Sequence, residues 1–525
     1  MKQQESYKIS LFMLLLFAFC EGAAVMVLEL IGGRMIAPVY GSSLIVWTTV
    51  LGITMSALAL GYFIGGNIAI KKNVLNQLYL LFFSAATLIL IMPKVASIAI
   101  DLIYFDSLFI SVFIASLLLL FLPVAILGAT TPILVKLVFN HGISQGKSSG
   151  HVYGASTIGG IIFTFLVGFW LVPDYGLSTT GFIIGVGISI LPTYYLIKSI
   201  SLKYALIPVI FIVLGLTLNY SNDKVKGVKV IHQSEGLLGQ LLVVDQPKSN
   251  GANGFERIMY VNRMGQTWID LNTGNSIWSY PNYITVLASS LKEKPDVLIL
   301  GIGGGTLANL LINVLGANIE TVELDERIGK IASRNFNMNK QVNLNIDDAR
   351  HFIKTSKKKY DLIIFDVFKG EVPPSHVLTV ECFQEAKNNL KEDGFMIINF
   401  NGFVNGPKGK AGRAVIKTIL ASGFHVNIFP TVGNEEDRNI LYTASPKKRT
   451  FDQTRINLNL YNKAVNIDTM QLNLDNIKFK PDDQPLTDNY PVLELLNLEA
   501  AQAWRKSYNE NHTKKYKDKG LPIFK

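Results

Sequence analysis

The sequence predicts a multi-pass α-helical membrane domain followed by an α/β Rossmann-like domain, with a small antiparallel β unit between them. Three observations carry this prediction. Residues 9–220 are mostly apolar spans joined by short loops, residues 227–275 alternate as strands do, and later residues alternate between strands and helices. We therefore expect four segments: about seven membrane helices over 1–220, the β unit over 221–280, the Rossmann-like domain over 281–500 and a basic tail over 501–525.

Seven stretches are long and apolar enough to cross a bilayer. A helix needs about 20 apolar residues to span the hydrocarbon core, and the stretches lie near 9–31, 44–70, 74–93, 105–127, 152–172, 178–198 and 203–219. The first contains acidic residues, ends without a small-x-small site and is followed at once by more spans. We interpret it as a retained helix and not as a cleaved signal peptide. The lipid bilayer is thus an expected partner.

Loop charge predicts an orientation for these spans. The seven-span prediction places the loops on two sides of the membrane, and Arg34 lies on one side. The N-terminus and the loops on the other side carry most of the lysines: Lys2, Lys8, Lys71, Lys72, Lys136, Lys147, Lys198 and Lys203. Because cytoplasmic loops are enriched in Lys and Arg, we expect the N-terminus in the cytoplasm. An odd number of spans then carries the C-terminal domain to the outside of a cell membrane, and a miscounted span would reverse this.

Ionisable residues occur in or beside the first span, namely Glu21, Glu29 and Arg34. Charged groups at membrane depth are costly and usually face a partner or a water-filled cavity. A polar path or cation site and an internal Glu–Arg structural pair are equally good interpretations. Recurring small residues are better explained by close helix packing than by transport: Gly61, Gly65, Gly66, Gly154, Gly159, Gly160 and Gly168.

The overall composition excludes several functions. The net charge is +10, but the lysines are dispersed and lack interleaved aromatic residues, so we expect no nucleic acid partner. The basic tail Lys514–Lys519 is typical of a solvated end near an anionic membrane surface. Cys20 and Cys382 lie in different regions, which argues against a disulfide framework. No metal site is expected.

The most informative motif is a glycine-rich turn after a buried strand, Asp296–Leu300. The helical run Leu307–Leu315 follows it, and the turn contains Gly301, Gly303, Gly304 and Gly305. Glycines let the backbone approach a ligand, and the helix N-terminus offers free N–H donors to an anionic group. A second strand, 319–322, ends at Glu323 just before Asp325, where a carboxylate suits a ribose diol. This order of elements predicts nucleoside binding.

Two later strands also end in acids. Asp347 and Asp348 follow the third strand, where Asp348 can accept a hydrogen bond from an adenine amine or, as an equal alternative, cap the helix that begins at Arg350. The fourth strand, Tyr360–Phe365, ends at Asp366. A carboxylate at the carboxyl end of a parallel strand faces the ligand crevice, where it can hold an attacking amine and accept its proton.

Together these motifs resemble the membrane-fused branch of the spermidine synthase family, which has the class I S-adenosylmethionine-dependent methyltransferase fold. The resemblance covers nearly the whole chain and rests on Leu28-Glu29-Leu30, Arg34–Pro38, Tyr40–Ser43, Trp47, Gly128–Pro132, Gly301–Gly305, Val322–Asp325, Asp347–Arg350, Asp366, Leu486–Asp488 and Pro491-Val492. It implies a donor that is S-adenosylmethionine or its decarboxylated form, and an amine acceptor. It also implies that Gln266, Glu323 and Asp348 touch the donor, that Asp366 serves the amine, and that Tyr280 lies near it.

The chain departs from this family at the positions that select the substrates. Polyamine synthases carry an Asp in the glycine loop that holds the amine of the decarboxylated donor, and Gly304 stands there in this chain. An Asp would repel the carboxylate of intact S-adenosylmethionine, so its absence removes discrimination against that form. The second Asp that grips a diamine is also missing, since Asp366 is followed by Val367–Gly370. Pro281-Asn282 stand where acidic or His residues would help to bind a polyamine.

Three functions follow from these features. The favoured one is methyl transfer from S-adenosylmethionine to an amine such as a protein lysine, with aromatic walls drawn from Trp268, Trp278, Tyr280, Phe365 and Phe368. The donor would then have to cross the bilayer, and the membrane half becomes a candidate conduit. The second is aminopropyl transfer to a polyamine, and the third is a transporter whose soluble domain senses a nucleoside. The sequence is also compatible with a homodimer. We expect segment 403–413 to be a mobile loop without a catalytic or binding role.

Overall fold

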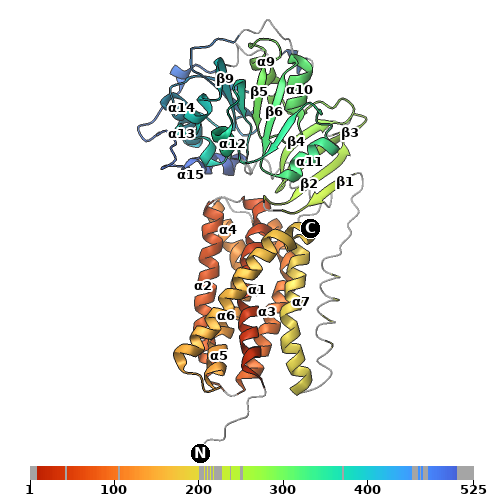
Figure 1. Cartoon of the computed structure of the whole chain (residues 1–525), viewed down its shortest axis with the longest axis vertical. Coiled ribbons are helices and arrows are strands. Elements are labelled where there is room, and N and C mark those ends of the chain that lie inside the picture. Colours follow the sequence, from red (N-terminus) through yellow and green to blue (C-terminus); the bar gives the residue numbers. More distant parts are fainter. Residues whose placement is uncertain are drawn as a thin grey trace, which may run out of the picture. The chain divides into compact units, whose positions relative to one another are not determined.

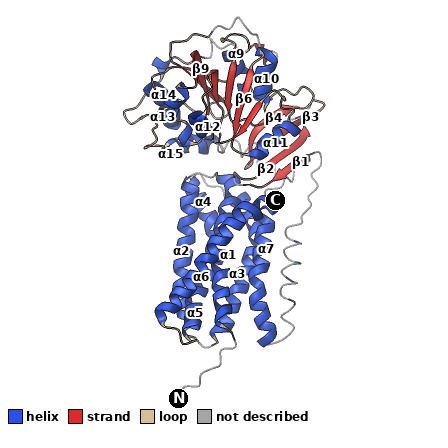
Figure 2. Cartoon of the chain, in the orientation of Figure 1, coloured by secondary structure: helices blue, strands red, loops and turns tan. Residues whose placement is uncertain are grey.

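The computed structural model describes residues 9–41, 44–71, 73–103, 107–199, 228–236, 238–248, 252–368, 372–451, 459–460, 463–464 and 471–504, together with residues 206, 210, 213 and 217. These residues form two compact units, one made of the N-terminal helices with residues 233–241 and one that holds the sheets and the remaining helices (Figures 1 and 2). Nearly all of the predicted span 203–219, the boundary at 221–224 and the tail beyond 504 lie outside the described residues.

The N-terminal unit is helical over the described residues of 9–199, apart from short connections. Its elements are α1 (Leu11–Tyr40), α2 (Leu44–Ala69), α3 (Val74–Leu102), α4 (Leu108–Ser116), the π-helix η1 (Leu117–Phe121), α5 (Leu122–Phe139), α6 (Gln145–Leu166), the π-helix η2 (Val167–Leu171) and α7 (Val172–Ser199). Within the described residues, five continuous helices are long and apolar enough to cross a membrane. Many of their large apolar side chains are exposed, as in Met55, Phe63, Phe165 and Trp170.

The last of these five helices corresponds to two predicted spans. It covers Gln145–Lys198, 54 residues, and would be about 80 Å long at 1.5 Å per residue, far more than a bilayer core of about 30 Å. Its backbone is not helical at Gly176, where φ is 80° and ψ is 176°. This break separates the predicted spans 152–172 and 178–198. Six of the seven predicted spans therefore have a helical counterpart.

Glycines bring pairs of helices into backbone contact. A Cβ atom added at Gly61 or Gly65 of α2 would lie 2.3 or 2.2 Å from the carbonyl oxygens of Ala125 and Ala129 on α5. A Cβ atom at Gly159 of α6 would lie 2.1 Å from the carbonyl oxygen of Phe19 on α1. These contacts confirm the predicted packing role for these three glycines, whereas Gly66, Gly154 and Gly168 have open space beside them.

The predicted small β unit is a four-stranded sheet. Its strands are β1 (Lys229–Ser234), β2 (Leu241–Pro247), β3 (Phe255–Val261) and β4 (Met264–Asp270), in the order β1-β2-β3-β4. Asn262 and Arg263 join β3 to β4 with φ of 48° and 65°. Two residues at positive φ make the tight hairpin turn whose twist matches that of the paired strands. This turn fixes the register of β4, which carries Gln266 and Trp268.

The larger sheet confirms the predicted α/β Rossmann-like class. Its strands are β5 (Asp296–Leu300), β6 (Asn318–Glu323), β7 (Asn343–Ile346), β8 (Tyr360–Phe365), β9 (Leu390–Asn401), β10 (His425–Pro430) and β11 (Asn439–Ser445), in the order β10-β11-β9-β8-β5-β6-β7. Strands β5 to β9 pair in parallel, and β11 is antiparallel to both β9 and β10. The chain runs outward from β5 to β7 and returns to β8 on the other side of β5. Ligands bind at such a switch point, beyond the carboxyl ends of the strands.

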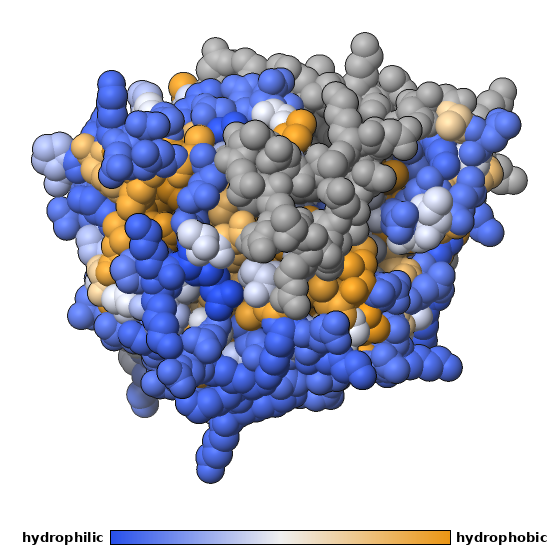
Figure 3. All heavy atoms as spheres, turned by 90° about the horizontal axis from the view of Figure 1, so that it is seen from above, coloured by the Kyte–Doolittle hydropathy of each residue, from blue (hydrophilic) through white to orange (hydrophobic). Residues whose placement is uncertain are grey.

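Helices cover both faces of this sheet (Figure 2). They are α9 (Tyr280–Ala288), α10 (Thr306–Leu315), α11 (Glu326–Asn335), α12 (Ala349–Thr355), α13 (Val380–Lys387), α14 (Lys410–Ala421) and α15 (Leu493–Leu496), with short 3₁₀ turns η4 (Ser375–Val377), η5 (Pro407–Gly409) and η6 (Leu474–Asn476). A separate two-stranded sheet joins β12 (Asn459–Leu460) to β13 (Lys463–Ala464). The face drawn in Figure 3 is largely hydrophilic, with apolar side chains in smaller patches.

The segment 403–413, predicted as a loop, is helical from residue 407 onward. Residues 407–409 form η5, and residues 410–413 are the first turn of α14. Arg413, which is 1% exposed, donates from Nε to Asp483 at 2.6 Å and from Nη1 to the carbonyl oxygens of Val404 and Gly406 at 3.0 and 2.9 Å. The guanidinium thus ties this segment to residues 70 positions later in the chain.

Candidate active site

The glycine turn between β5 and α10 needs its glycines for two reasons. Gly301, Gly303 and Gly305 have φ of 88°, 52° and 76°, a region that side chains rarely allow. A Cβ atom at Gly301 would also lie 2.3 Å from the carbonyl oxygen of Asp366. The turn therefore contacts the end of β8 directly, and the N-terminus of α10 opens at the switch point of the sheet.

Glu323 lies at the end of β6, beside this turn. Its Oε2 accepts a hydrogen bond from the backbone N–H of Ile302 at 3.3 Å, and its Oε1 accepts one from the N–H of Asp325 at 3.0 Å. Burial raises the pKa of Glu323 above its ordinary value, against these backbone hydrogen bonds. Each oxygen keeps a lone pair, so the carboxylate can still accept from two neighbouring hydroxyl groups.

Thr267 of β4 packs against the turn, although no motif in its neighbourhood had singled it out. Its Oγ1 accepts a hydrogen bond from the backbone N–H of Gly304 at 2.7 Å. A Cβ atom at Gly304 would lie 2.6 Å from Thr267 Cγ2 and 3.0 Å from the ring of Phe336. The space that a side chain would need at position 304 is thus already filled.

Asp366, at the carboxyl end of β8, is held by two donors from other elements. Its Oδ1 accepts a hydrogen bond from Asn399 Nδ2 at 2.7 Å, and its Oδ2 accepts one from the Tyr280 hydroxyl group at 3.2 Å. Burial raises the pKa of Asp366 to about 6, and the two hydrogen bonds limit that rise. Burial and the Asp366 carboxylate raise the pKa of Tyr280 well above its ordinary value, so Tyr280 stays a donor.

A short chain of amides fixes Asn399 behind Asp366. Asn439, the first residue of β11, donates from Nδ2 to the side-chain oxygens of Asn399 and Asn401, both at 2.9 Å. Asn399 is 1% exposed, and its amide nitrogen is therefore oriented toward Asp366. Sequence reasoning missed Asn399, although a polar residue at the end of the apolar run Phe395–Ile398 was a usable signal.

The other acids predicted at this edge hold helix ends. Asp325 caps α11 by accepting from the N–H of Arg327 at 2.9 Å, and also binds its guanidinium group. Asp348 Oδ1 caps α12 by accepting from the N–H groups of Arg350 and His351, both at 3.0 Å. Asp347 contacts His351 Nδ1 at 2.8 Å.

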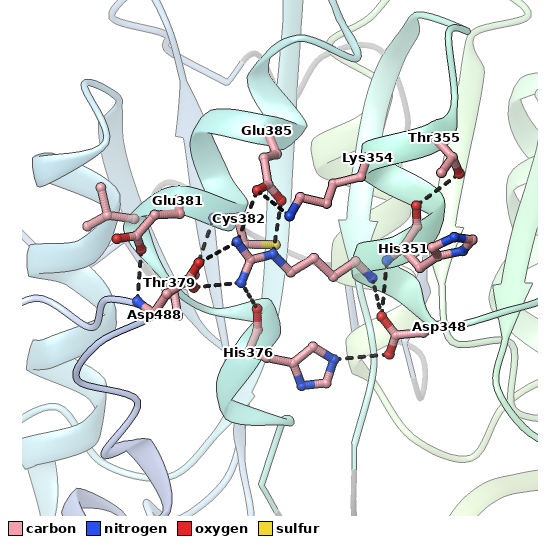
Figure 4. A network of polar contacts seen from close by, with 12 residues as sticks. Asp348, His351, Lys354, Thr355, His376, Thr379, Glu381, Cys382, Glu385 and Asp488 are labelled. Carbon is pink, nitrogen blue, oxygen red and sulfur yellow. Dashed lines mark hydrogen bonds and ion pairs between the residues drawn. The ribbon is translucent and has the colours of Figure 1, made fainter.

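The second oxygen of Asp348 also has a partner. His376 Nε2, on η4, lies 3.0 Å from Asp348 Oδ2 (Figure 4). Burial works against ionisation, but the hydrogen bonds from His351 and His376 keep the pKa of Asp348 below its ordinary value. The helix-cap interpretation of Asp348 thus describes its geometry in this structure, and an adenine amine would have to share or replace the contact with His376.

The aromatic candidates lie in different surroundings. The ring of Trp278 is 6.3 Å from that of Tyr280, and both side chains are partly buried, as is Phe368. Trp268 packs against the core of the small sheet and donates Nε1 to Glu256 at 3.0 Å. Phe365 is 1% exposed and packs edge-on against Phe383 in the core of the larger sheet. Gln266, on β4 next to Thr267, is partly buried.

The polar residues predicted at membrane depth all lie on α1. Glu21 is 3% exposed and accepts hydrogen bonds from α5 and α6. Glu29 is partly buried. Arg34 donates from Nη1 to the carbonyl oxygen of Gly236, in the segment 233–241 that groups with the helices. Glu21 is thus buried and hydrogen-bonded to two other helices, whereas Glu29 on the same helix is partly exposed.

Comparison with known proteins defines the class of the α/β unit. Residues 278–403 match the model of the family described as Spermine/spermidine synthase domain. This range contains the glycine turn, Glu323, Asp348, Asp366 and Asn399. The α/β unit is accordingly a spermidine synthase-like domain, and the helical unit lies outside the matched range.

Two curated relatives and one solved structure are similar to parts of this chain. The chain is 32% identical over 177 residues to a polyamine aminopropyltransferase of Vibrio vulnificus, which is 32% of this chain and 58% of that protein. It is 31% identical over 141 residues to an N-terminal histidine N-methyltransferase of Emericella nidulans, 26% of this chain and 24% of that protein. A crystal structure of a probable spermidine synthase from Corynebacterium glutamicum matches with a TM-score of 0.36 at 19% identity, over 42% of this chain and 81% of that one. The chain thus spans less than two thirds of either curated relative.

Proposed function

We propose that this chain is a membrane-embedded transferase that moves the methyl group of S-adenosylmethionine to an amine. The observation that carries the proposal is the setting of Asp366. It is a partly buried carboxylate at the switch point of the sheet, it adjoins the glycine turn, and it is oriented by Tyr280 and Asn399. The apolar helices Leu11–Ala37 to Gln145–Lys198 support the membrane part of the proposal.

The donor would bind at the glycine turn. The N-terminus of α10 offers backbone donors, and Glu323 offers both carboxylate oxygens to the ribose hydroxyl groups. Asp347 and Asp348 lie at the end of β7, one strand further along the edge, where the adenine would lie. The methyl group would then point toward Asp366.

Asp366 would act on the acceptor amine. Its carboxylate holds the amine in line with the methyl carbon, the nitrogen lone pair forms the new N–C bond, and the S–C bond breaks with its electron pair left on sulfur. The proton that the nitrogen loses goes to Asp366, whose pKa of about 6 suits a base near neutral pH. Trp278 and Phe368 are the proposed aromatic walls for a lysine side chain, while Trp268 belongs to the core of the small sheet.

The intact donor is preferred because no acid stands in the glycine turn. Gly304 has no side chain, and Thr267 with Phe336 fills the adjacent space. A carboxylate there would repel that of S-adenosylmethionine and attract the amine of the decarboxylated form. This position therefore supports methyl transfer over aminopropyl transfer.

Aminopropyl transfer to a polyamine is the second candidate, because several relatives carry that name. Titration calorimetry of the purified full chain with intact and decarboxylated S-adenosylmethionine separates the two. We expect the intact donor to bind at least tenfold more tightly. Transfer of labelled methyl groups to lysine-containing peptides, at least about 100-fold slower in Asp366→Asn, is the second arm. Tighter binding of the decarboxylated donor, with a label in its aminopropyl group moving to putrescine, would select the second candidate.

A further inference from the structure

The helical unit contains a carboxyl group that the transferase reaction does not use. Glu21 of α1 is 3% exposed. Its Oε1 accepts a hydrogen bond from Thr131 Oγ1 of α5 at 3.3 Å, and its Oε2 accepts one from Ser156 Oγ of α6 at 2.7 Å. One ionisable group thus connects three helices that are far apart in the sequence.

The surrounding backbone keeps these three side chains together. Gly22 follows Glu21, and a Cβ atom there would lie 1.9 Å from the carbonyl oxygen of Ser156. The backbones of α1 and α6 are therefore in contact beside the Glu21 carboxyl group. On α5, Pro132 follows Thr131 and has no N–H to donate to the carbonyl of Gly128. The backbone hydrogen bonding of α5 is therefore weakened next to Thr131, whose hydroxyl group donates to Glu21.

The chemistry of this site suits a proton better than a metal ion. Sodium-like or calcium-like ions require about six oxygen ligands, whereas one carboxyl group and two hydroxyl groups meet here at hydrogen-bond distances. Among the described residues, no group of three or more His, Cys, Asp or Glu could hold a metal. A hydroxyl group donates to a carboxylate and accepts from a carboxylic acid. Both protonation states of Glu21 can therefore be hydrogen-bonded in place.

Few other titratable groups face Glu21. Tyr62 of α2 interacts electrostatically with Glu21 and with Tyr153 of α6, and Cys20 precedes Glu21 on α1. Tyrosine and cysteine are neutral near pH 7. Within the part of the chain that the structure describes, an ionised Glu21 would thus be stabilised by the hydroxyl groups of Thr131 and Ser156, and such a charge at membrane depth is costly. Its protonation state should therefore respond to any change in helix packing.

We propose that Glu21, Thr131 and Ser156 form a proton-binding site of the helical unit. Uptake or release of the proton changes how closely α1 packs against α5 and α6, because the charged form requires more hydration than the neutral form. The site is independent of the transferase chemistry at Asp366. It gives the helical unit a means of coupling helix movement to a proton gradient.

Infrared spectroscopy of the full chain tests proton binding. A pH titration should show a carbonyl stretch of a protonated carboxyl group that is lost in Glu21→Gln and kept in Glu29→Gln, a matched control on the same helix. Ser156→Ala removes a donor to the charged form, so the titration should move up by at least one pH unit. A titration that survives Glu21→Gln, or a band that sodium ions remove at constant pH, would overturn the proposal.

The thiol of Cys20 reports the coupled change in packing. Cys20 is partly buried, and Cys382, the second free cysteine, is buried in the other unit and can be changed to Ala. Labelling of any thiol accelerates with pH because the thiolate reacts, so the comparison is with Glu21→Gln in the same background. We expect the labelling rate to rise with pH at least threefold more in the Glu21 protein. Equal pH profiles would show that the proton does not change the packing.

Discussion

The proposed methyl transfer should fall about tenfold for each pH unit below about 6. The proposed reaction needs Asp366 as a carboxylate, and burial raises the pKa of that group to about 6. The sign follows from the chemistry: lowering the pH protonates the base, so activity is present above the pKa and lost below it. At about pH 5 only about a tenth of the molecules carry the active carboxylate, and at about pH 7 about nine tenths do.

The hydrogen bond from Asn399 gives this pH profile a structural control. Asn399 donates to Asp366 at 2.7 Å and is itself held by Asn439. A hydrogen bond to a charged group is worth about 1.5–3 kcal/mol, and 1.4 kcal/mol is one pH unit. Asn399→Leu keeps the size of the side chain and removes the donor. The acid limb of the profile should therefore move up by about one pH unit or more.

The assay is the pH dependence of kcat/KM for labelled methyl transfer by the full chain. Tyr280→Phe removes the longer hydrogen bond, 3.2 Å, and should move the limb less than Asn399→Leu. Asp366→Asn should lower the rate by about 10²–10⁴-fold at every pH while donor affinity stays within about threefold. A flat profile between about pH 5 and 8, or a limb that Asn399→Leu leaves in place, would refute the role of Asp366 as the base.

Three further outcomes follow from the contacts of the α/β unit. Glu323→Gln should weaken donor binding in calorimetry by about 10–100-fold, since it removes a charged acceptor for two hydroxyl groups, and an unchanged Kd would contradict that role. Gly304→Asp should lower the unfolding temperature, because the Cβ atom meets Thr267 at 2.6 Å and overpacking costs about 1–3 kcal/mol, and it should shift the donor preference toward the decarboxylated form, because the new carboxylate repels that of S-adenosylmethionine. Arg413→Leu should destabilise the unit by about 3–5 kcal/mol in thermal unfolding, because it leaves Asp483 buried without its ion pair, and the double variant with Asp483→Leu should recover part of that loss.

The sequence predicted the strands and turns around the site because their signals are local. The buried strands Asp296–Leu300 and Tyr360–Phe365 have the predicted bounds, and the glycines of the turn have the positive φ that their residue type allows. A parallel sheet then aligns the ends of these strands, so Asp366 and Glu323 could be assigned to one edge in advance. The local sequence pattern was therefore sufficient to predict these strands, the glycine turn and the two acids at the strand ends.

The partners of these residues could not be predicted, because they come from distant segments. Asn399 meets Asp366 only through the pairing of β8 with β9, and Asn439 meets Asn399 only through the pairing of β9 with β11. Thr267 reaches the glycine turn from the small sheet, where alternation alone does not show which face meets the turn. The break at Gly176 was also hidden, since glycine occurs in these helices both with and without a change in direction.

The contacts sort the five acids at the carboxyl edge into two groups. Asp325, Asp347 and Asp348 are engaged by helix N–H groups, by Arg327 or by histidines, and they stabilise local structure whether or not a ligand is present. Glu323 and Asp366 are the two whose pKa values burial raises. Such carboxylates are disfavoured as ions until a positive charge arrives, and the proposed sulfonium donor and amine acceptor would bring that charge to the edge. A turn with a third carboxylate at position 304 would favour a donor without its own carboxylate, so the glycine at that position supports the proposal of intact S-adenosylmethionine as the donor.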